Sequence, residues 1–96
     1  MGNYRLREEA EEDLIRIHQR GVREHGETQA DRYYETFFDR FEQLAKQPYL
    51  YQAVDDIREG FRRSVCGKHS IYYRIDKHGV EIILVLGRQD HEKILS

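Results

Sequence analysis

Apolar residues recur along the chain with two different periods, one typical of helices and one typical of strands. The first helical stretch places Ala10, Leu14 and Ile17 on one face, with charged side chains opposite them. Gly26 follows this stretch and can adopt the backbone conformation that ends many helices. The pattern therefore predicts a first helix that ends at His25 and Gly26.

A wider and more aromatic stripe follows between residues 30 and 45. Its apolar members keep helical spacing throughout: Ala30, Tyr33, Tyr34, Phe37, Phe38, Phe41, Leu44 and Ala45. Thr28 precedes the stripe at the position of an N-cap, where its hydroxyl can accept backbone N–H bonds. The helix is expected to end at Gln47, because Pro48 disfavours helical geometry in the residue before it. Since few residues separate the two helices, we expect an antiparallel hairpin.

Alternation of apolar and polar residues predicts strands at both ends of the chain. Residues 4–6 form a short alternating run, expected to be an edge strand. Three later runs predict consecutive antiparallel strands: residues 61–66, 69–75 and 80–86. Turns are expected at Gly67-Lys68 and at residues 76–79. The last run is apolar on both faces after Glu81, which indicates a central strand.

These elements predict an α+β fold. A helix hairpin with one apolar stripe and a sheet with one apolar face can bury each other's apolar surface. Ninety-six residues are too few for two separate cores, so residues 1–96 are expected to form one domain. The expected architecture is an N-terminal two-helix hairpin packed on a small three- to four-stranded antiparallel sheet. Apolar residues show no regular spacing in residues 49–60, which are expected to form a loop with one helical turn near Ile57.

Composition narrows the classes of function. The net charge of −2 argues against a general nucleic-acid binder, so no direct sequence-specific nucleic-acid binding is expected. No apolar run is long enough to cross a bilayer, and the N-terminus has no apolar signal segment. We therefore expect a cytoplasmic protein without a membrane partner. Cys66 is the single cysteine and is expected to be a small buried apolar residue.

A metal-free nuclease would need a cationic cluster and a general acid or base. The available side chains are Arg62, Arg63, Lys68, His69, Arg74, Arg88 and His91. Strand alternation sends Arg62 and Arg63 to opposite faces, and it places His69 on the face of Ile71 and Tyr73. We therefore assign no catalytic residue, and we expect His69 to be a packed or hydrogen-bonded sheet residue.

Metal and cofactor sites are not expected either. The five histidines are scattered without ligand spacing, and no glycine-rich loop could cradle a phosphate. The chain does contain seven tyrosines, more than a small core usually needs. Exposed tyrosines beside arginines are typical anchors of protein interfaces, which favours a binding function.

Six stretches together resemble the ParE branch of the ParE/RelE superfamily of bacterial toxins. They keep the order and spacing of that family: Tyr4-Arg5-Leu6, Ala10-Glu11-Glu12-Asp13-Leu14, Gly26 through Gln29-Ala30 to Tyr33, Ile57-Arg58-Glu59-Gly60-Phe61-Arg62-Arg63, residues 67–74 and residues 83–90. The chain departs from the family pattern at Arg7, where a Ser cap usually begins the helix. No single stretch is specific, but together they cover nearly the whole chain.

The resemblance to RelE-type ribosome-dependent ribonucleases is weaker. Their sheet arginine would fall near Ser70 and their C-terminal catalytic tyrosine near Leu95, leaving only Arg63 and Arg88 as counterparts. A ribonuclease without those groups would lose most of its proton transfer and charge stabilisation. The resemblance therefore implies a toxin that acts by binding rather than as an enzyme.

The ParE resemblance implies the toxin of a type II toxin–antitoxin system with two protein partners. A ParD-like antitoxin, encoded by an adjacent gene, would cover the hairpin and sheet with a segment that folds on binding. DNA gyrase would be the poisoned target. The implied target contacts are Arg88, Gln89, Asp90, His91 and Arg58, and the implied antitoxin contacts are Arg62, Arg63, Tyr33 and Tyr72. Two alternatives stay open: a RelE-like mRNA endoribonuclease, and a non-toxic member that only binds partners.

Overall fold

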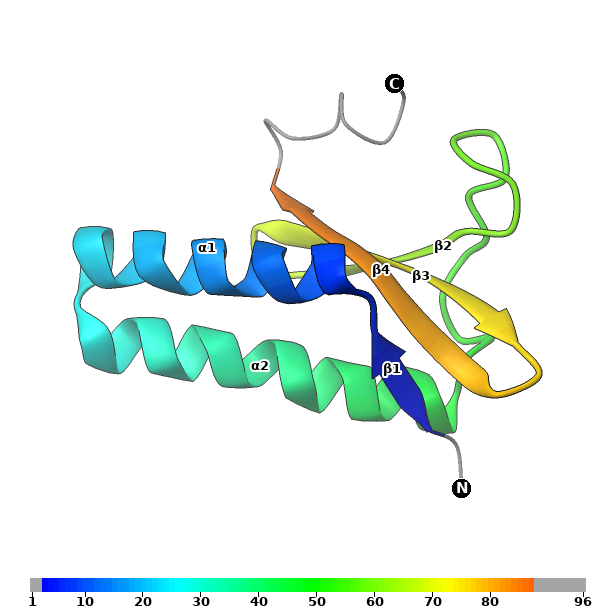
Figure 1. The fold of residues 1–96 in the computed structure, drawn as a ribbon, viewed down its shortest axis with the longest axis horizontal. Coiled ribbons are helices and arrows are strands. Elements are labelled where there is room, and N and C mark those ends of the chain that lie inside the picture. Colours follow the sequence, from blue (N-terminus) through cyan, green and yellow to red (C-terminus); the bar gives the residue numbers. More distant parts are fainter. Residues whose placement is uncertain (1–2, 88–96) are drawn as a thin grey trace.

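Two antiparallel helices pack against one face of a four-stranded sheet (Figure 1). The structure is a computed structural model, and it describes residues 3–87. Its elements are β1 (Tyr4–Leu6), α1 (Glu8–His25), α2 (Glu27–Lys46), β2 (Arg62–Cys66), β3 (His69–Asp76) and β4 (Gly79–Gly87). The predicted α+β architecture with an N-terminal helix hairpin is confirmed.

The sheet is mixed rather than purely antiparallel. Its strand order is β1-β4-β3-β2, so β1 is an edge strand and β4 a central strand, as predicted. However, β1 pairs with β4 in parallel, with Tyr4 opposite Val80 and Leu6 opposite Ile82. The chain leaves β1 directly into α1, so β1 has no hairpin partner and reaches β4 through a crossover, which makes the pair parallel.

A β-bulge divides β4 into two parts, and the alternation of side chains between the two faces of the sheet shifts by one residue from one part to the other. Tyr72 pairs with Leu84 and Tyr73 with Ile82, so Ile83 between them has no partner on β3. An extra residue of this kind reverses the faces of all side chains that follow it. Consequently Ile82 and Val85 both contribute to the main core, whereas Leu84 packs on the opposite face.

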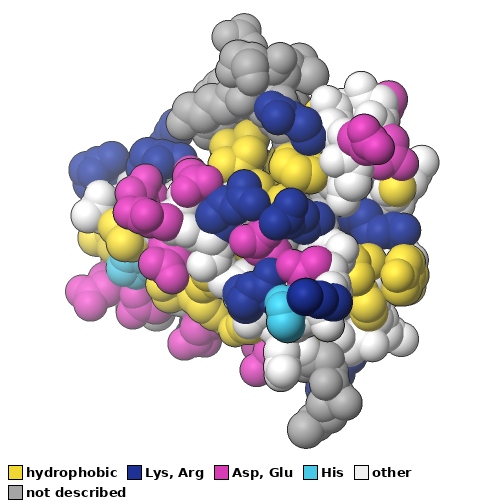
Figure 2. All heavy atoms as spheres, turned by 45° about the vertical axis from the view of Figure 1, so that its right-hand side comes forward, with side chains coloured by type: hydrophobic (Ala, Val, Ile, Leu, Met, Phe, Trp, Pro, Cys, Tyr) yellow, Lys and Arg dark blue, Asp and Glu magenta, His cyan; other side chains and the backbone are white. Residues whose placement is uncertain are grey.

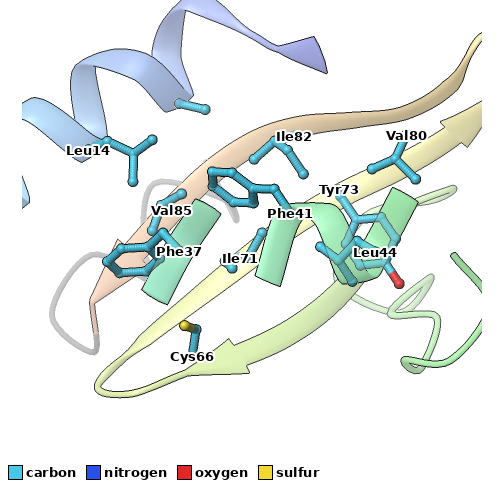
Figure 3. Close-up of a cluster of buried hydrophobic side chains, with 11 residues drawn as sticks. Leu14, Phe37, Phe41, Leu44, Cys66, Ile71, Tyr73, Val80, Ile82 and Val85 are labelled. Carbon is cyan, nitrogen blue, oxygen red and sulfur yellow. The ribbon is translucent and has the colours of Figure 1, made fainter. Parts of the chain in front are cut away.

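The main core lies between the helix hairpin and the inner face of the sheet (Figure 3). Its buried members come from both helices and from three strands: Ala10, Leu14, Phe37, Phe41, Leu44, Cys66, Ile71, Tyr73, Val80, Ile82 and Val85. The apolar faces expected from both helical stripes are therefore confirmed. Cys66 is a buried free thiol, also as predicted.

A second, smaller apolar cluster covers part of the outer face of the sheet. Tyr72 and Leu86 are each 1% exposed there, beneath residues of the segment between α2 and β2. That segment contains the predicted turn, in which the Val54 carbonyl accepts the N–H groups of Ile57 and Arg58. The segment therefore folds back over the sheet, and its apolar residues shield Tyr72.

Helix α1 covers the part of the β4 edge that the short strand β1 leaves free. The Arg7 N–H donates to the Ile82 carbonyl at 2.9 Å, and the Val85 N–H donates to the Asp13 carboxylate at 3.0 Å. Asp13 is only 5% exposed and also accepts a hydrogen bond from Arg16. A helix side chain thus supplies the acceptor that a neighbouring strand would otherwise provide.

The predicted N-cap at Thr28 is wrong. Helix α2 begins two residues earlier than this cap would place it, at Glu27, and Gly26 occupies the capping position without any side-chain cap bond. Gly26 also ends α1, with φ of 90° and its N–H donated to the Val22 carbonyl. One glycine therefore serves both helices, and this tight connection places Thr28 inside the first turn of α2 rather than before it.

Candidate functional site

Tyr33 connects α2 to the turn between β2 and β3 through hydrogen bonds of its hydroxyl. Its hydroxyl accepts the Lys68 N–H at 3.0 Å and lies 2.7 Å from His69 Nδ1. The turn fits closely against this ring, because a Cβ at Gly67 would lie 2.6 Å from the Tyr33 ring. Burial raises the pKa of Tyr33, so its hydroxyl stays protonated. The prediction that His69 is a hydrogen-bonded sheet residue is confirmed.

Arg62 lies at the surface beside the segment that follows α2. Its guanidinium donates to the Tyr51 carbonyl at 2.7 Å and lies 4.9 Å from the centre of the Tyr49 ring. Tyr49 is 71% exposed, so this arginine–aromatic stack faces the solvent. Arg58 stacks similarly on Phe61, at 5.9 Å. Two of the predicted contact arginines are therefore held against aromatic rings.

Arg63 and Tyr72 are neighbours across β2 and β3. The Arg63 Nε donates to the Ser70 hydroxyl at 3.0 Å, on the opposite side of the strand from Arg62. Tyr72 is almost completely buried, so its ring supports the sheet rather than contributing to a surface. This burial does not favour a direct contact between Tyr72 and a partner.

The predicted contact residues do not form one site. Tyr33 lies at the turn between β2 and β3, whereas Arg62 lies at the other end of β2, beside Tyr49. The C-terminal residues Arg88, Gln89, Asp90 and His91 lie outside the described residues. Within residues 3–87, no group of three or more His, Cys, Asp or Glu side chains could hold a metal ion.

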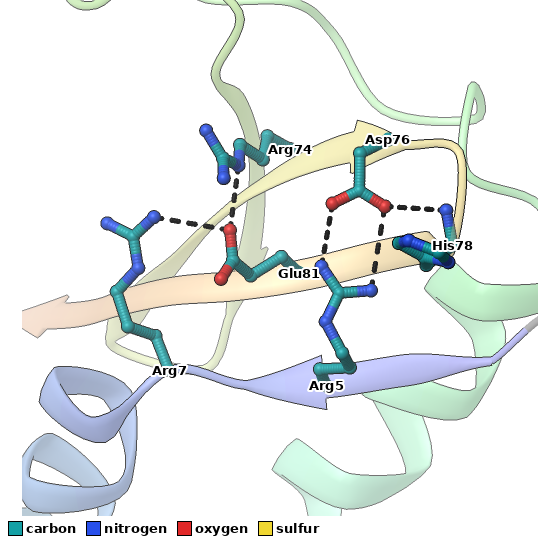
Figure 4. A network of polar contacts seen from close by, with 6 residues as sticks. All are labelled: Arg5, Arg7, Arg74, Asp76, His78 and Glu81. Carbon is teal, nitrogen blue, oxygen red and sulfur yellow. Dashed lines mark hydrogen bonds and ion pairs between the residues drawn. The ribbon is translucent and has the colours of Figure 1, made fainter.

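The outer face of β1, β4 and β3 carries a network of ion pairs that the sequence analysis did not single out (Figure 4). Glu81 accepts from Arg74 at 2.7 Å and from Arg7 at 3.2 Å, and Arg5 pairs with Asp76 at 2.6 Å. The hydrogen bond from Arg5 holds the pKa of Asp76 below its ordinary value. Strand alternation could have revealed this row, because Arg5, Arg74 and Glu81 alternate with residues of the core.

Arg40 is a second residue that the sequence analysis missed. From α2 it donates to the Ser64 hydroxyl and to the Val65 carbonyl, both at 2.7 Å. These bonds tie the outer edge of β2 to the helix. The apolar stripe of α2 gives no indication of Arg40, because its partners belong to a strand that follows only after the long loop.

The outer surface of the helix hairpin exposes apolar side chains on α1. Ile15 is 54% exposed and Val22 is 37% exposed, two helical turns apart. Near Val22 a shallow groove of about 610 Å³ lies between the helices, lined by His18, Gln19, Val22, Arg23 and Glu27. His18 Nε2 lies 2.7 Å from an Asp31 oxygen and links the two helices there. Of the helices described, none has the length and apolarity needed to cross a membrane.

Comparison with known families identifies the chain. The family model described as "ParE toxin of type II toxin-antitoxin system, parDE" matches residues 4–92, which is most of the sequence. The chain belongs to the ParE toxin family. The family resemblance derived from the six sequence stretches is therefore confirmed.

Two ParE relatives illustrate the similarity at the level of sequence. Toxin ParE1 of Caulobacter vibrioides is 35% identical over 86 residues, which are 90% of this chain and 88% of that toxin. Toxin ParE1 of Mycobacterium tuberculosis is 31% identical over 62 residues, which are 64% of this chain and 63% of that toxin. The similarity to the Caulobacter toxin thus extends over nearly the full length of both chains.

A solved structure supports the ParE fold. A chain described as "Chromosomal ParDE TA system from P. aeruginosa" superimposes with a TM-score of 0.80, covering 91% of this chain and 96% of that chain. The two sequences are only 16% identical, so this match concerns the fold alone. It agrees with the arrangement of two helices on a mixed four-stranded sheet.

Proposed function

We propose that this ParE-family toxin poisons DNA gyrase by binding to it and that a ParD-like antitoxin neutralises it. The observation that carries the proposal is the family match over residues 4–92, together with a fold shared with a chain of a ParDE system. Poisoning would consist of holding the gyrase–DNA cleavage complex open, so that replication stalls. The toxin would require no cofactor.

The arrangement of the sheet favours binding over catalysis. By the resemblance to RelE-type ribonucleases, their sheet arginine would fall near Ser70, whose buried hydroxyl accepts a hydrogen bond from Arg63. The outer face beside Ser70 is covered by the apolar cluster around Tyr72, and the arginines of this face gather farther along the sheet around Glu81. A phosphodiester cleavage site needs charge stabilisation at the reacting group, which this apolar surface does not offer.

The surface of the helix hairpin suits an antitoxin segment that folds on binding. An amphipathic helix laid along α1 would bury Ile15 and Val22, whose spacing of seven residues matches two helical turns. Beyond the hairpin, the segment could continue to the exposed stack of Arg62 on Tyr49. Arg63 and Tyr33 are further candidate contacts, and Tyr72 is the least suitable because it is buried.

Expression of the chain in bacteria tests the proposal. We expect growth arrest, rescue by coexpression of the small gene beside the toxin gene, and accumulation of cleaved DNA when purified gyrase is incubated with the toxin. Cleavage of translating mRNA with gyrase unaffected would instead identify a RelE-like endoribonuclease. Absence of any growth arrest would identify a member that only binds partners.

Arg88, Gln89, Asp90 and His91 are the proposed contacts with gyrase, together with Arg58. Arg88→Ala should weaken DNA cleavage by gyrase, and Lys93→Ala, which removes the same charge nearby, serves as the matched control. Thermal unfolding monitored by circular dichroism should show the same midpoint for both variants. Unchanged poisoning by Arg88→Ala would refute the assignment of this contact.

A further inference from the structure

The charges of the molecule are separated between its two layers. Helices α1 and α2 contain six Lys or Arg and eleven Asp or Glu residues. Residues 3–7 and 62–87, which form the sheet and its turns, contain seven Lys or Arg residues and only Asp76 and Glu81 as acids. The net charge of −2 therefore combines an acidic helix layer with a basic sheet layer.

Part of this basic charge is displayed on one side of the sheet. We call this surface the arginine face and define it by three arginines and two acids: Arg5, Arg7, Arg74, Asp76 and Glu81. Arg5 and Arg74 flank Glu81 in register across three neighbouring strands. Figure 2 shows one side of the molecule, where dark blue side chains surround a smaller magenta group near the centre.

The two acids orient the arginines without burying them. Glu81 is only 16% exposed and holds Arg7 and Arg74, while Asp76 holds Arg5 (Figure 4). The side chains of Arg5, Arg7 and Arg74 remain 42%, 34% and 47% exposed. Each guanidinium has five N–H donors, so each retains donors for an external anion. The face thus presents preoriented cations across the width of three strands.

The chemistry of the arginine face favours a phosphate backbone over a protein. Protein interfaces are anchored by apolar and aromatic side chains in addition to arginine. None of the large hydrophobic side chains exposed in the described structure belongs to this face: Ile15, Val22, Tyr49, Leu50 and Val65. Contacts with the DNA backbone require mainly an array of cations and hydrogen-bond donors.

We propose that the arginine face binds the sugar–phosphate backbone of duplex DNA without sequence preference. The choice of DNA as the biological anion rests on the proposed function, since gyrase holds duplex DNA beside any toxin bound to it. Three arginines offset by two acids predict weak binding, within the roughly 10⁻⁴ to 10⁻⁶ M typical of non-specific association. Weak contacts are sufficient when a second site raises the effective concentration to about the millimolar range.

Fluorescence anisotropy of a short labelled duplex, titrated with the purified toxin over a series of salt concentrations, tests this proposal. Arg74→Gln and Arg5→Gln should each weaken binding several-fold at low salt, and each should reduce the slope of log K against log salt by about 0.9. Arg32→Gln removes an exposed arginine from α2, in the acidic layer, and should leave affinity and slope unchanged. Thermal unfolding of every variant verifies that the fold is retained.

Three results would overturn the proposal. The first is absence of binding to the duplex at low salt, and the second is an equal loss for Arg32→Gln and Arg74→Gln. The third is stronger competition by polyglutamate than by unlabelled duplex at equal charge, which would indicate an acidic protein partner instead. Because the titration contains no gyrase, its failure leaves gyrase poisoning to be decided separately by the cleavage assay.

Discussion

Asp13 connects the first helix to the central strand through a buried hydrogen bond. Its carboxylate accepts the Val85 N–H at 3.0 Å, where no strand covers the edge of β4. Asp13→Ala would leave this N–H without an acceptor in the core, so we expect the free energy of unfolding to fall by about 2–3 kcal/mol. Urea denaturation measures the loss.

The neighbouring residue provides the control for Asp13. Glu12 is exposed on the same helix, and Glu12→Ala should change the free energy of unfolding by less than about 0.5 kcal/mol. Asp13→Asn should be intermediate, because the amide oxygen can still accept the Val85 N–H. Equal stability of Asp13→Ala and Glu12→Ala would show that the edge of β4 does not depend on this carboxylate.

The partly buried Tyr33 and the fully buried Tyr73 make the stability of the toxin sensitive to alkaline pH. Burial raises the pKa values of Tyr33 and Tyr73 above the ordinary value of 10.0. The unfolded chain therefore loses these protons first as the pH rises, so their contribution to stability is complete below pH 10 and is lost above it. We expect the free energy of unfolding to decline above about pH 10.

Phenylalanine variants isolate this effect. Tyr33→Phe combined with Tyr73→Phe should be less stable at neutral pH, because the Tyr73 hydroxyl also donates to the Pro48 carbonyl at 2.8 Å. The free energy of unfolding of the double variant should nevertheless fall less steeply with pH above about pH 10. In Tyr49→Phe, which changes a tyrosine that is 71% exposed, the free energy of unfolding should fall with pH as steeply as in the unsubstituted chain. An unchanged slope in the double variant would assign the alkaline loss to other groups.

The sequence predicted residues whose structure depends on near neighbours in the chain, and it did not predict those whose contacts lie far away in the chain. The two-residue alternation of a strand predicted correctly that Arg62 and Arg63 lie on opposite faces, because this alternation is a local property. The hydrogen bonds of Asp13 and Tyr33 were not predicted, since their partners lie 72 and 36 positions away in the chain. Contacts at such separations depend on how the layers dock, which local periodicity does not specify.

At the scale of elements, the contact between α2 and the turn of β2 and β3 depends on one glycine. Gly67 has φ of 61°, and an added Cβ would meet the Tyr33 ring at 2.6 Å. Gly60 has φ of 82°, but no neighbouring atom would lie within 4 Å of a Cβ added there. Gly60→Ala should therefore cost only backbone strain of about 1–2 kcal/mol.

Gly67→Ala carries the same kind of strain together with the clash. Displacing the Tyr33 ring should raise its cost above that of Gly60→Ala by about 1 kcal/mol or more, since the hydrogen bond to the Lys68 N–H is lost as well. Chemical denaturation of both variants provides the comparison. Equal losses at the two glycines would mean that the ring moves aside without cost.

The element boundaries followed well from periodicity, whereas strand direction and the bulge did not. Alternation in residues 4–6 indicates a strand but contains no information on whether its partner runs parallel. The bulge at Ile83 is equally hidden, because β4 is apolar on both faces and either register buries apolar side chains. Both features are decided by the crossover and by the docking of α1 rather than by the strand sequences.

At the scale of the whole molecule, net charge is a poor guide to the partners of this toxin. A value of −2 argues against nucleic-acid binding only if the charges are evenly mixed. Here the helices are acidic and the sheet is basic, so the two sides of the molecule suit different partners. This separation follows from counting charges within each predicted element, whereas the net charge of the whole chain conceals it.

The acidic helix layer, with its exposed apolar residues, predicts the character of the antitoxin segment. A complementary segment should be amphipathic, with apolar residues over Ile15 and Val22 and basic residues along its flanks. Ile15→Asp would place a charge in the centre of this contact, and we expect the affinity for the antitoxin to fall about tenfold or more. Leu50→Asp makes the same change at an equally exposed position in the loop after α2, outside the hairpin surface, and should reduce the affinity less than Ile15→Asp. Calorimetric titration of both variants with the antitoxin from the adjacent gene makes the comparison, and equal losses would exclude the hairpin surface as the specific contact.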